Sequence, residues 1–162
     1  MKINYNKAYT LVELLVVVAI IGVLSSIVIT SANQSRAKGI DAAVKTNLVN
    51  AKLQAEVYFI KNGESFNNGT SNICASDFAQ DGTTKSIKNY LITAIEAFGS
   101  TSYTYSTALF TASTATRAAC HATANKWAME SPLKTGGNWC VDSAGTSKYT
   151  NTTLASGRDF CP

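Results

Sequence analysis

Side chains that commonly carry chemistry are sparse in this chain of 162 residues. It has one histidine, His121, so neither a His-paired metal site nor a Ser-His-Asp triad with any redundancy can be assembled. A calcium site needs several acidic residues at patterned spacing, but these aspartates stand alone: Asp77, Asp81, Asp142 and Asp159. No glycine-rich phosphate-binding loop occurs. We therefore expect a protein that is not an enzyme and uses no metal or cofactor, with His121 at the surface or at a sheet edge.

The cysteines are the second group with chemical potential, and all of them follow the apolar N-terminal part of the chain: Cys74, Cys120, Cys140 and Cys161. Their number is even, and they show no CxxC or Cys/His zinc spacing. Two disulfides in an oxidising compartment are therefore favoured over four free thiols. Four cysteines allow three pairings, and the sequence does not choose among them. Nearness to the C-terminus favours joining Cys140 to Cys161, which would leave Cys74 with Cys120.

Composition and charge limit the classes of partner. The length suits one globular domain with an appendage. Charged residues make up 15% of the chain, which is low for a soluble cytosolic protein. The net charge is +4, but Lys2 and Lys7 lie in the first eight residues, and without them 12 Lys and Arg face 10 Asp and Glu. This balance is too small to argue for nucleic-acid binding.

One acidic residue stands in an unusual place. Residues 11–29 are apolar except for Glu13 and two serines, and nineteen residues are just enough to cross a bilayer core of about 30 Å. A secretory signal would be shorter and would end in a small-residue cleavage site. A buried core helix would need a larger domain, and a plain membrane anchor fits the length but leaves Glu13 unexplained. A carboxylate in this position needs a cationic partner and indicates a function.

The chain itself offers no such cation, because no Lys or Arg occurs between Lys7 and Arg36. Cleavage after Ala8 would create one, since the new α-amine of Tyr9 would be charged near neutral pH. That amine would lie one helical turn from its own Glu13, or beside the Glu13 of a neighbouring copy.

The run Ala-Tyr-Thr-Leu-Val-Glu-Leu-Leu at residues 8–15 resembles the leader junction of type IV prepilins and pseudopilins. The resemblance implies that Ala8 is the last leader residue, Tyr9 the methylated N-terminus, Glu13 the glutamate of the fifth mature position, and Gly22 a site where the helix loosens in filaments. Two departures are plain. Ala8 replaces the usual glycine, and Thr30 stands where many pilins have a kinking proline. We expect Gly22 and the following serines to supply any looseness.

The elements that position these residues follow from periodicity. Residues 31–61 carry apolar side chains at helical spacing, namely Ile40, Val44, Leu48, Ala51, Ala55, Tyr58 and Phe59. No proline interrupts residues 9–61, so one helix of about 50 residues is expected, ending at Asn62-Gly63. We divide the chain into a leader (1–8), this helix (9–30 in the membrane or filament core, 31–61 amphipathic) and a globular domain (62–162).

The globular domain should be α+β. A second helix is expected over residues 85–98, stopped by Gly99, and strands over residues 103–110, 126–129 and 139–142, with one more in the tail from 148 to 162. Residues 100–116 also suit a stalk-like linker, but their aromatic residues favour a strand. The long helix, apolar in its first half, should pack on an antiparallel sheet of three or four strands. Residues 139–143 and the final Cys161-Pro162 look similar to pilins of monoderm bacteria.

The resemblance implies a structural subunit of a type IV pilus-like filament serving adhesion, twitching motility or DNA uptake. A pseudopilin of a secretion or competence apparatus and a non-assembling membrane-anchored domain remain alternatives. The implied partners are further copies, the prepilin peptidase, the assembly platform with its ATPase, the cytoplasmic membrane, and DNA or host surfaces; the implied location is this membrane and then an extracellular filament. Basic residues of the helix would pair with neighbours or grip DNA: Arg36, Lys38, Lys45, Lys52 and Lys61.

Overall fold

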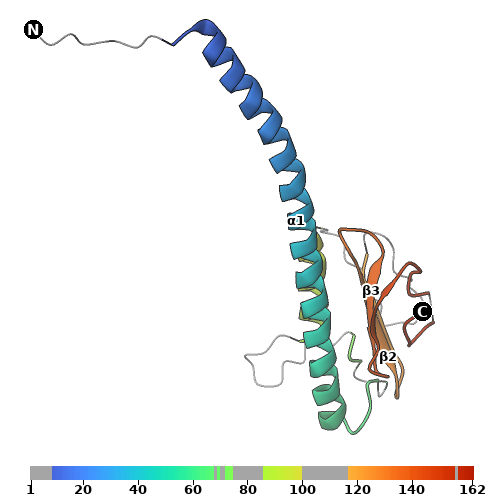
Figure 1. The fold of residues 1–162 in the computed structure, drawn as a ribbon. Coiled ribbons are helices and arrows are strands. Elements are labelled where there is room, and N and C mark those ends of the chain that lie inside the picture. Colours follow the sequence, from blue (N-terminus) through green and yellow to red (C-terminus); the bar gives the residue numbers. More distant parts are fainter. Residues whose placement is uncertain (1–8, 68, 70–71, 75–85, 100–116, 156) are drawn as a thin grey trace, which may run out of the picture. The chain divides into compact units, whose positions relative to one another are not determined.

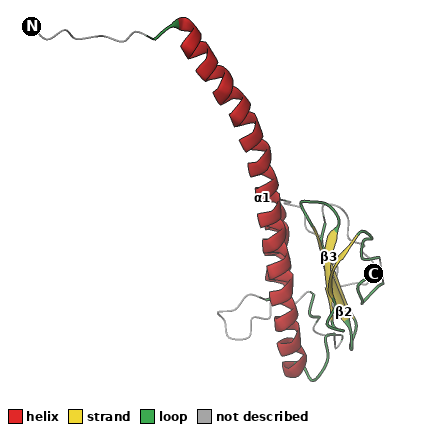
Figure 2. Ribbon diagram, in the orientation of Figure 1, coloured by secondary structure: helices red, strands yellow, loops and turns green. Residues whose placement is uncertain are grey.

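The computed structural model describes residues 9–67, 69, 72–74, 86–99, 117–155 and 157–162. It confirms the α+β fold, with one long N-terminal helix and a four-stranded antiparallel sheet (Figures 1 and 2). The leader and the strand expected at residues 103–110 lie outside the described residues. The chain divides into two compact units, Met1–Arg36 and Ala37–Pro162, with the division inside the long helix.

Helix α1 spans Leu11–Lys61 without interruption, including Gly22 and Gly39. Inside its apolar part, the hydroxyl of Ser26 donates to the carbonyl of Val23 at 2.7 Å, and that of Thr30 donates to Ile27 at 2.9 Å. These bonds satisfy hydroxyls that would otherwise face an apolar environment unpaired.

The end of α1 lies where the sequence predicts it. Gly63 adopts the left-handed conformation with φ of 68°, and the following N–H, that of Glu64, donates to the carbonyl of Phe59 at 2.9 Å. This six-to-one bond closes a Schellman motif and pairs a carbonyl that the helix end leaves open.

The core of the second unit uses the apolar stripe predicted for residues 31–61. Its fully buried members are Val44, Leu48, Ala51, Ala55 and Tyr58, and Ile40 and Phe59 are partly buried against the same cluster. Helix α2, Ile87–Phe98, adds Ile87, Leu91, Ala94 and Ile95. Ser86 caps α2 by accepting the N–H of Asn89 at 3.2 Å, and Gly99 ends it with φ of 88°. The predicted helix was therefore right within two residues.

The sheet is a simple meander of β1 (Ala119–Ala122), β2 (Trp127–Pro132), β3 (Asn138–Asp142) and β4 (Ser147–Thr150), each antiparallel to the next. The single strand expected near residues 126–129 is therefore the second of two, because β1 precedes it and pairs with it. Strand β3 matches the expected strand at 139–142, and β4 begins one residue before the predicted tail.

Alternate side chains of the sheet face opposite layers, as strand geometry requires. Cys120, Trp127, Met129 and Val141 point to the main core beneath α1 and α2. On the opposite face, Ala119 and Ala128 pack with Leu154 of the C-terminal tail, residues 151–162. The tail thus covers the face of the sheet that the helices leave open.

Buried polar groups on that outer face hold the tail. Glu130 accepts the N–H of Leu154 at 2.9 Å, and Asp142 accepts the N–H of Cys161 at 3.0 Å. The Nδ1 atom of His121 lies 2.8 Å from the carbonyl oxygen of Arg158. His121 lies on β1, at the edge of the described sheet, which agrees with the expected sheet-edge position. The expected surface position was wrong, because only 1% of this residue is exposed. The tail buries it.

Two disulfides join the four cysteines, Cys74 to Cys120 and Cys140 to Cys161. Their Cα–Cα distances are 5.6 and 5.8 Å, the usual separation for such a bond. The first ties the segment after α1 to β1, and the second ties the end of the tail to β3. This pairing is the one that nearness to the C-terminus favoured.

Candidate processing and assembly site

The first turn of α1 is closed by a capping box between Thr10 and Glu13. The Oε2 atom of Glu13 accepts the backbone N–H of Thr10 at 2.9 Å and the hydroxyl of Thr10 at 2.8 Å. In return, the hydroxyl oxygen of Thr10 accepts the N–H of Glu13 at 3.3 Å. Two N–H groups that have no partner within a helix are thereby satisfied. Glu13 therefore stabilises the start of the helix as well as carrying a charge.

Sequence reasoning missed this role of Glu13, although a signal for it was present. Thr-x-x-Glu directly before an apolar run is the known pattern of a capping box. The two roles are compatible, because both bonds from Thr10 go to Oε2. Oε1 accepts no hydrogen bond from the residues that the structure describes. A carboxylate near a helix N-terminus is also favoured by the helix dipole.

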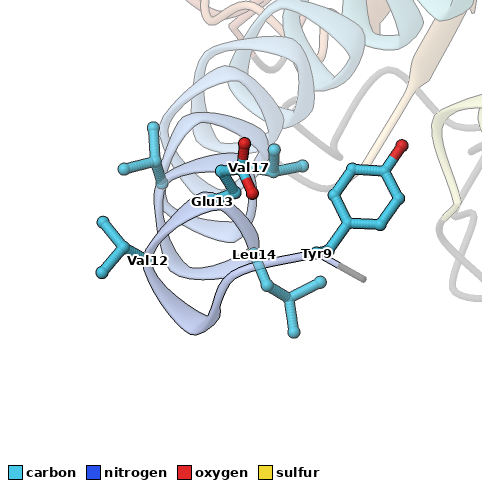
Figure 3. Close-up of a pocket in the computed structure, with 6 residues that line it drawn as sticks. Tyr9, Val12, Glu13, Leu14 and Val17 are labelled. Atoms are coloured by element: carbon cyan, nitrogen blue, oxygen red, sulfur yellow. The ribbon is translucent and has the colours of Figure 1, made fainter. Parts of the chain in front are cut away.

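A shallow hollow lies beside the first two turns of α1 (Figure 3). It is lined by Tyr9, Val12, Glu13, Leu14, Val16 and Val17. Tyr9, which precedes the helix, is 86% exposed. The structure therefore brings Tyr9 and Glu13 together at one apolar hollow, while Ala8 lies outside the described residues.

The apolar half of α1 is covered by nothing within the described chain. Its large side chains between Leu11 and Ile29 are 48–78% exposed. The helix is long and apolar enough to cross a membrane, with a mean hydropathy of 2.8 over its most apolar window. An apolar surface of this extent normally contacts lipid or another protein. The site therefore consists of a capped, acidic helix start followed by an uncovered apolar helix.

Residues 3–29 match the family model described as the prokaryotic N-terminal methylation motif. The chain carries the prepilin-type motif of type IV pilins and pseudopilins. No curated protein and no solved structure matches the chain. The motif indicates a structural subunit of a pilin-like or pseudopilin kind, and it implies processing by prepilin peptidase and assembly by type IV pilus-like machinery. Together with the apolar helix, the methylation motif fits a membrane-anchored precursor.

The matched span includes the four residues expected to act in processing and assembly: Ala8, Tyr9, Glu13 and Gly22. Of these, Gly22 lies within the unbroken helix, and an alanine-sized Cβ there would meet no other atom within 4 Å. Cleavage after Ala8 and loosening at Gly22 in a filament remain predictions.

Two basic residues expected on a solvated face or a DNA track are instead used by the fold. The Lys45 ammonium lies 4.7 Å from the ring centre of Trp139 on β3, a cation–π geometry. The Lys52 ammonium donates to the carbonyl of Gly145, in the β3–β4 turn, at 2.8 Å. Both side chains are half-buried, whereas Arg36, Lys38 and Lys61 are exposed. Contact of these basic side chains with neighbouring copies or with DNA stays a prediction.

Two acidic side chains, Asp41 and Asp142, also stabilise the fold. Asp41 of α1 is 5% exposed and accepts hydrogen bonds from Lys134 and Thr135. Asp142 accepts the N–H groups of Ala144 and Thr146 in addition to that of Cys161. Among the residues that the structure describes, no group of three or more metal-ligating side chains comes together.

Proposed function

We propose that this chain is a structural subunit of a type IV pilus-like filament at the cell surface, serving adhesion, twitching motility or DNA uptake. The observation that carries the proposal is the uncovered apolar helix directly after a capped glutamate, inside the matched methylation motif. Such a helix needs lipid before assembly and other helices after it.

The proposed processing step follows from the charges around the leader. Lys2 and Lys7 hold the leader on the cytoplasmic side, and the globular unit lies outside. The peptidase cuts the bond between Ala8 and Tyr9, and the new amine of Tyr9 becomes methylated. The positive charge then lies next to Glu13 in its own chain and within reach of the Glu13 of another copy.

The proposed assembly step uses the free oxygen of Glu13. Thr10 donates to Oε2, so Oε1 can accept a hydrogen bond that the charged Tyr9 amine of the terminal subunit donates. An unpaired charge in a low-dielectric bundle costs several kcal/mol, so pairing selects the copy that is fully inserted. The apolar segments then exchange lipid contacts for helix contacts.

Intact-mass spectrometry of the sheared surface fraction from the native host tests this function. The expected species is a chain that begins at methylated Tyr9, has four oxidised cysteines and is abundant in long filaments. The same mature chain confined to the envelope, without sheared filaments, would indicate a pseudopilin instead. A chain that still begins at Met1 and stays in membranes would contradict assembly and indicate an anchored exported domain.

A further inference from the structure

Helix α1 carries a second line of side chains within the Ala37–Pro162 unit, on the face turned away from the core. The exposed positions are Ala42, Thr46, Val49, Leu53, Glu56 and Ile60, which alternate spacings of four and three residues. Val49, Leu53 and Ile60 are 41%, 61% and 74% exposed. Alternating spacings of this kind place side chains in one row and are typical of a seam between two helices.

Among the residues that the structure describes, this exposed row is not part of the hydrophobic core. The core is built from a different row of α1 that includes Val44, Leu48 and Ala51. Single exposed apolar side chains are ordinary, but here three occupy one seam on one helix. Of the basic side chains in the same helix segment, Lys45, Lys52 and Lys61 lie off the row, and Lys38, four residues before Ala42, lies at its start. From Ala42 to Ile60 the row therefore carries no positive charge.

The charges near the row indicate what covers it. Glu56 lies in the row between Leu53 and Ile60 and is exposed. Lys38, also exposed, lies beside the start of the row. Neither side chain has an ion-pair partner among the described residues. They are 18 residues apart, which corresponds to about 27 Å along an α-helix.

We propose that this row is covered by a second copy of the chain, in parallel orientation and shifted by about 27 Å along the helix axis. Lys38 of one copy then lies beside Glu56 of the other, and Val49, Leu53 and Ile60 pack against the neighbouring helix. The inference rests on the proposed function, because insertion of every N-terminal segment into one membrane makes the helices parallel.

The proposed contact is between two different surface patches, so it does not close on itself. Each copy offers Lys38 to one neighbour and Glu56 to another, and repetition of such a head-to-tail contact builds an open helical assembly. The contact therefore extends filament packing from the apolar first half of α1 to the second half, and the ion pair sets the axial register.

Cysteine cross-linking of the full chain in its native host tests the register. The double variant Lys38→Cys/Glu56→Cys, oxidised in sheared filaments, should give a ladder of dimers, trimers and higher species on a non-reducing gel. Each single variant should stay monomeric, as should the matched double Lys38→Cys/Lys61→Cys, whose second cysteine lies off the row. Filaments in which the Lys38→Cys/Glu56→Cys chain stays monomeric would overturn the proposal, and so would dimers from Glu56→Cys alone.

If the Lys38→Cys/Glu56→Cys substitutions prevent assembly, exchanging the two charges tests the same pairing. Glu56→Lys should lower the sheared yield several-fold, and Lys38→Glu in the same chain should restore it. Leu53→Asp should lower the yield while Gln54→Asp, its neighbour off the row, should not. Failure of the exchange to restore filaments overturns the pairing while wild-type filaments uphold the proposed function. Absence of wild-type chain from the sheared fraction overturns both.

Discussion

Asp41 on α1 and Thr135 in the β2–β3 turn are joined across 94 residues of sequence by two hydrogen bonds to one carboxylate oxygen. The Thr135 N–H donates to Oδ2 at 3.3 Å, and its hydroxyl donates to the same atom at 2.5 Å. The other oxygen accepts the N–H of Lys134 at 2.5 Å. This carboxylate attaches the hairpin to the helix and accepts hydrogen bonds from N–H groups that the turn leaves without partners.

Asp41→Ala should therefore destabilise the globular unit by about 1–3 kcal/mol, because the N–H groups of Lys134 and Thr135 would lose the buried carboxylate that accepts their hydrogen bonds. Thr135→Val removes only the hydroxyl and should cost less, about 1 kcal/mol. Chemical unfolding of the full chain in detergent, followed by tryptophan fluorescence, measures both. Equal stability of Asp41→Ala and wild type would contradict the role assigned to the carboxylate.

Glu13→Gln should separate the capping role of Glu13 from its charge. Glutamine still accepts hydrogen bonds from Thr10 at this position of a capping box, so the helix start should persist while the charge is lost. We expect export and cleavage at wild-type levels with a large drop in the sheared filament fraction. Glu13→Val should lose both roles, and hydrogen exchange at the first turn of α1 should rise only in that variant.

Thr10 provides the matched control for this experiment. Thr10→Ser keeps the hydroxyl and should leave exchange of the first turn unchanged, whereas Thr10→Ala should raise it without altering the charge of Glu13. Normal filaments from Glu13→Gln would refute charge pairing and leave capping as the role of this residue.

The two disulfides should contribute differently to local and global stability. Replacement of both Cys140 and Cys161 by alanine opens a loop with a sequence separation of 21, and the chain-entropy estimate for such a loop is about 3 kcal/mol. Hydrogen exchange should accelerate mainly at the amides of Leu154 and position 161, because the tail loses its covalent bond to β3 and is held only by the hydrogen bonds to Glu130 and Asp142. Unchanged protection of these amides would show that the hydrogen bonds suffice.

Replacement of Cys74 and Cys120 should lower stability somewhat more, by about 4 kcal/mol, since their separation of 46 closes a longer loop. In this variant the tail amides should stay as protected from hydrogen exchange, relative to the other amides, as in the wild type. This result would distinguish it from the Cys140 and Cys161 variant. Thermal unfolding and hydrogen exchange of the same samples measure both effects.

Lys52→Gln should lower stability by about 1 kcal/mol or less, because the hydrogen bond to the Gly145 carbonyl is lost at a half-exposed site. Lys61→Gln, at an exposed position, should leave stability unchanged. A test of DNA binding should therefore reverse Arg36 and Lys61 rather than Lys45 and Lys52, whose reversal would disturb the packing of β3 and β4. Equal stability of Lys52→Gln and Lys61→Gln would show that the contact with Gly145 adds nothing.

What the sequence alone determined about this protein is local in origin. The length of the apolar run, the position of Glu13, the Thr10 cap and the helix ends at Gly63 and Gly99 all depend on residues within a few positions of one another. The core row of α1 is equally readable, because helical periodicity alone places Val44, Leu48, Ala51, Ala55 and Tyr58 on one face.

The tertiary structure decided the environments that distant segments create. Asp41 reads as a surface residue in its own helix and is buried only because a turn 94 residues away brings donors to it. His121 is buried by the tail, and Lys45 and Lys52 contact the β3–β4 hairpin. The cysteine pairing depends on which loop and tail segments the fold brings next to β1 and β3. Burial and pairing of this kind depend on contacts between segments far apart in sequence, and local periodicity does not predict such contacts.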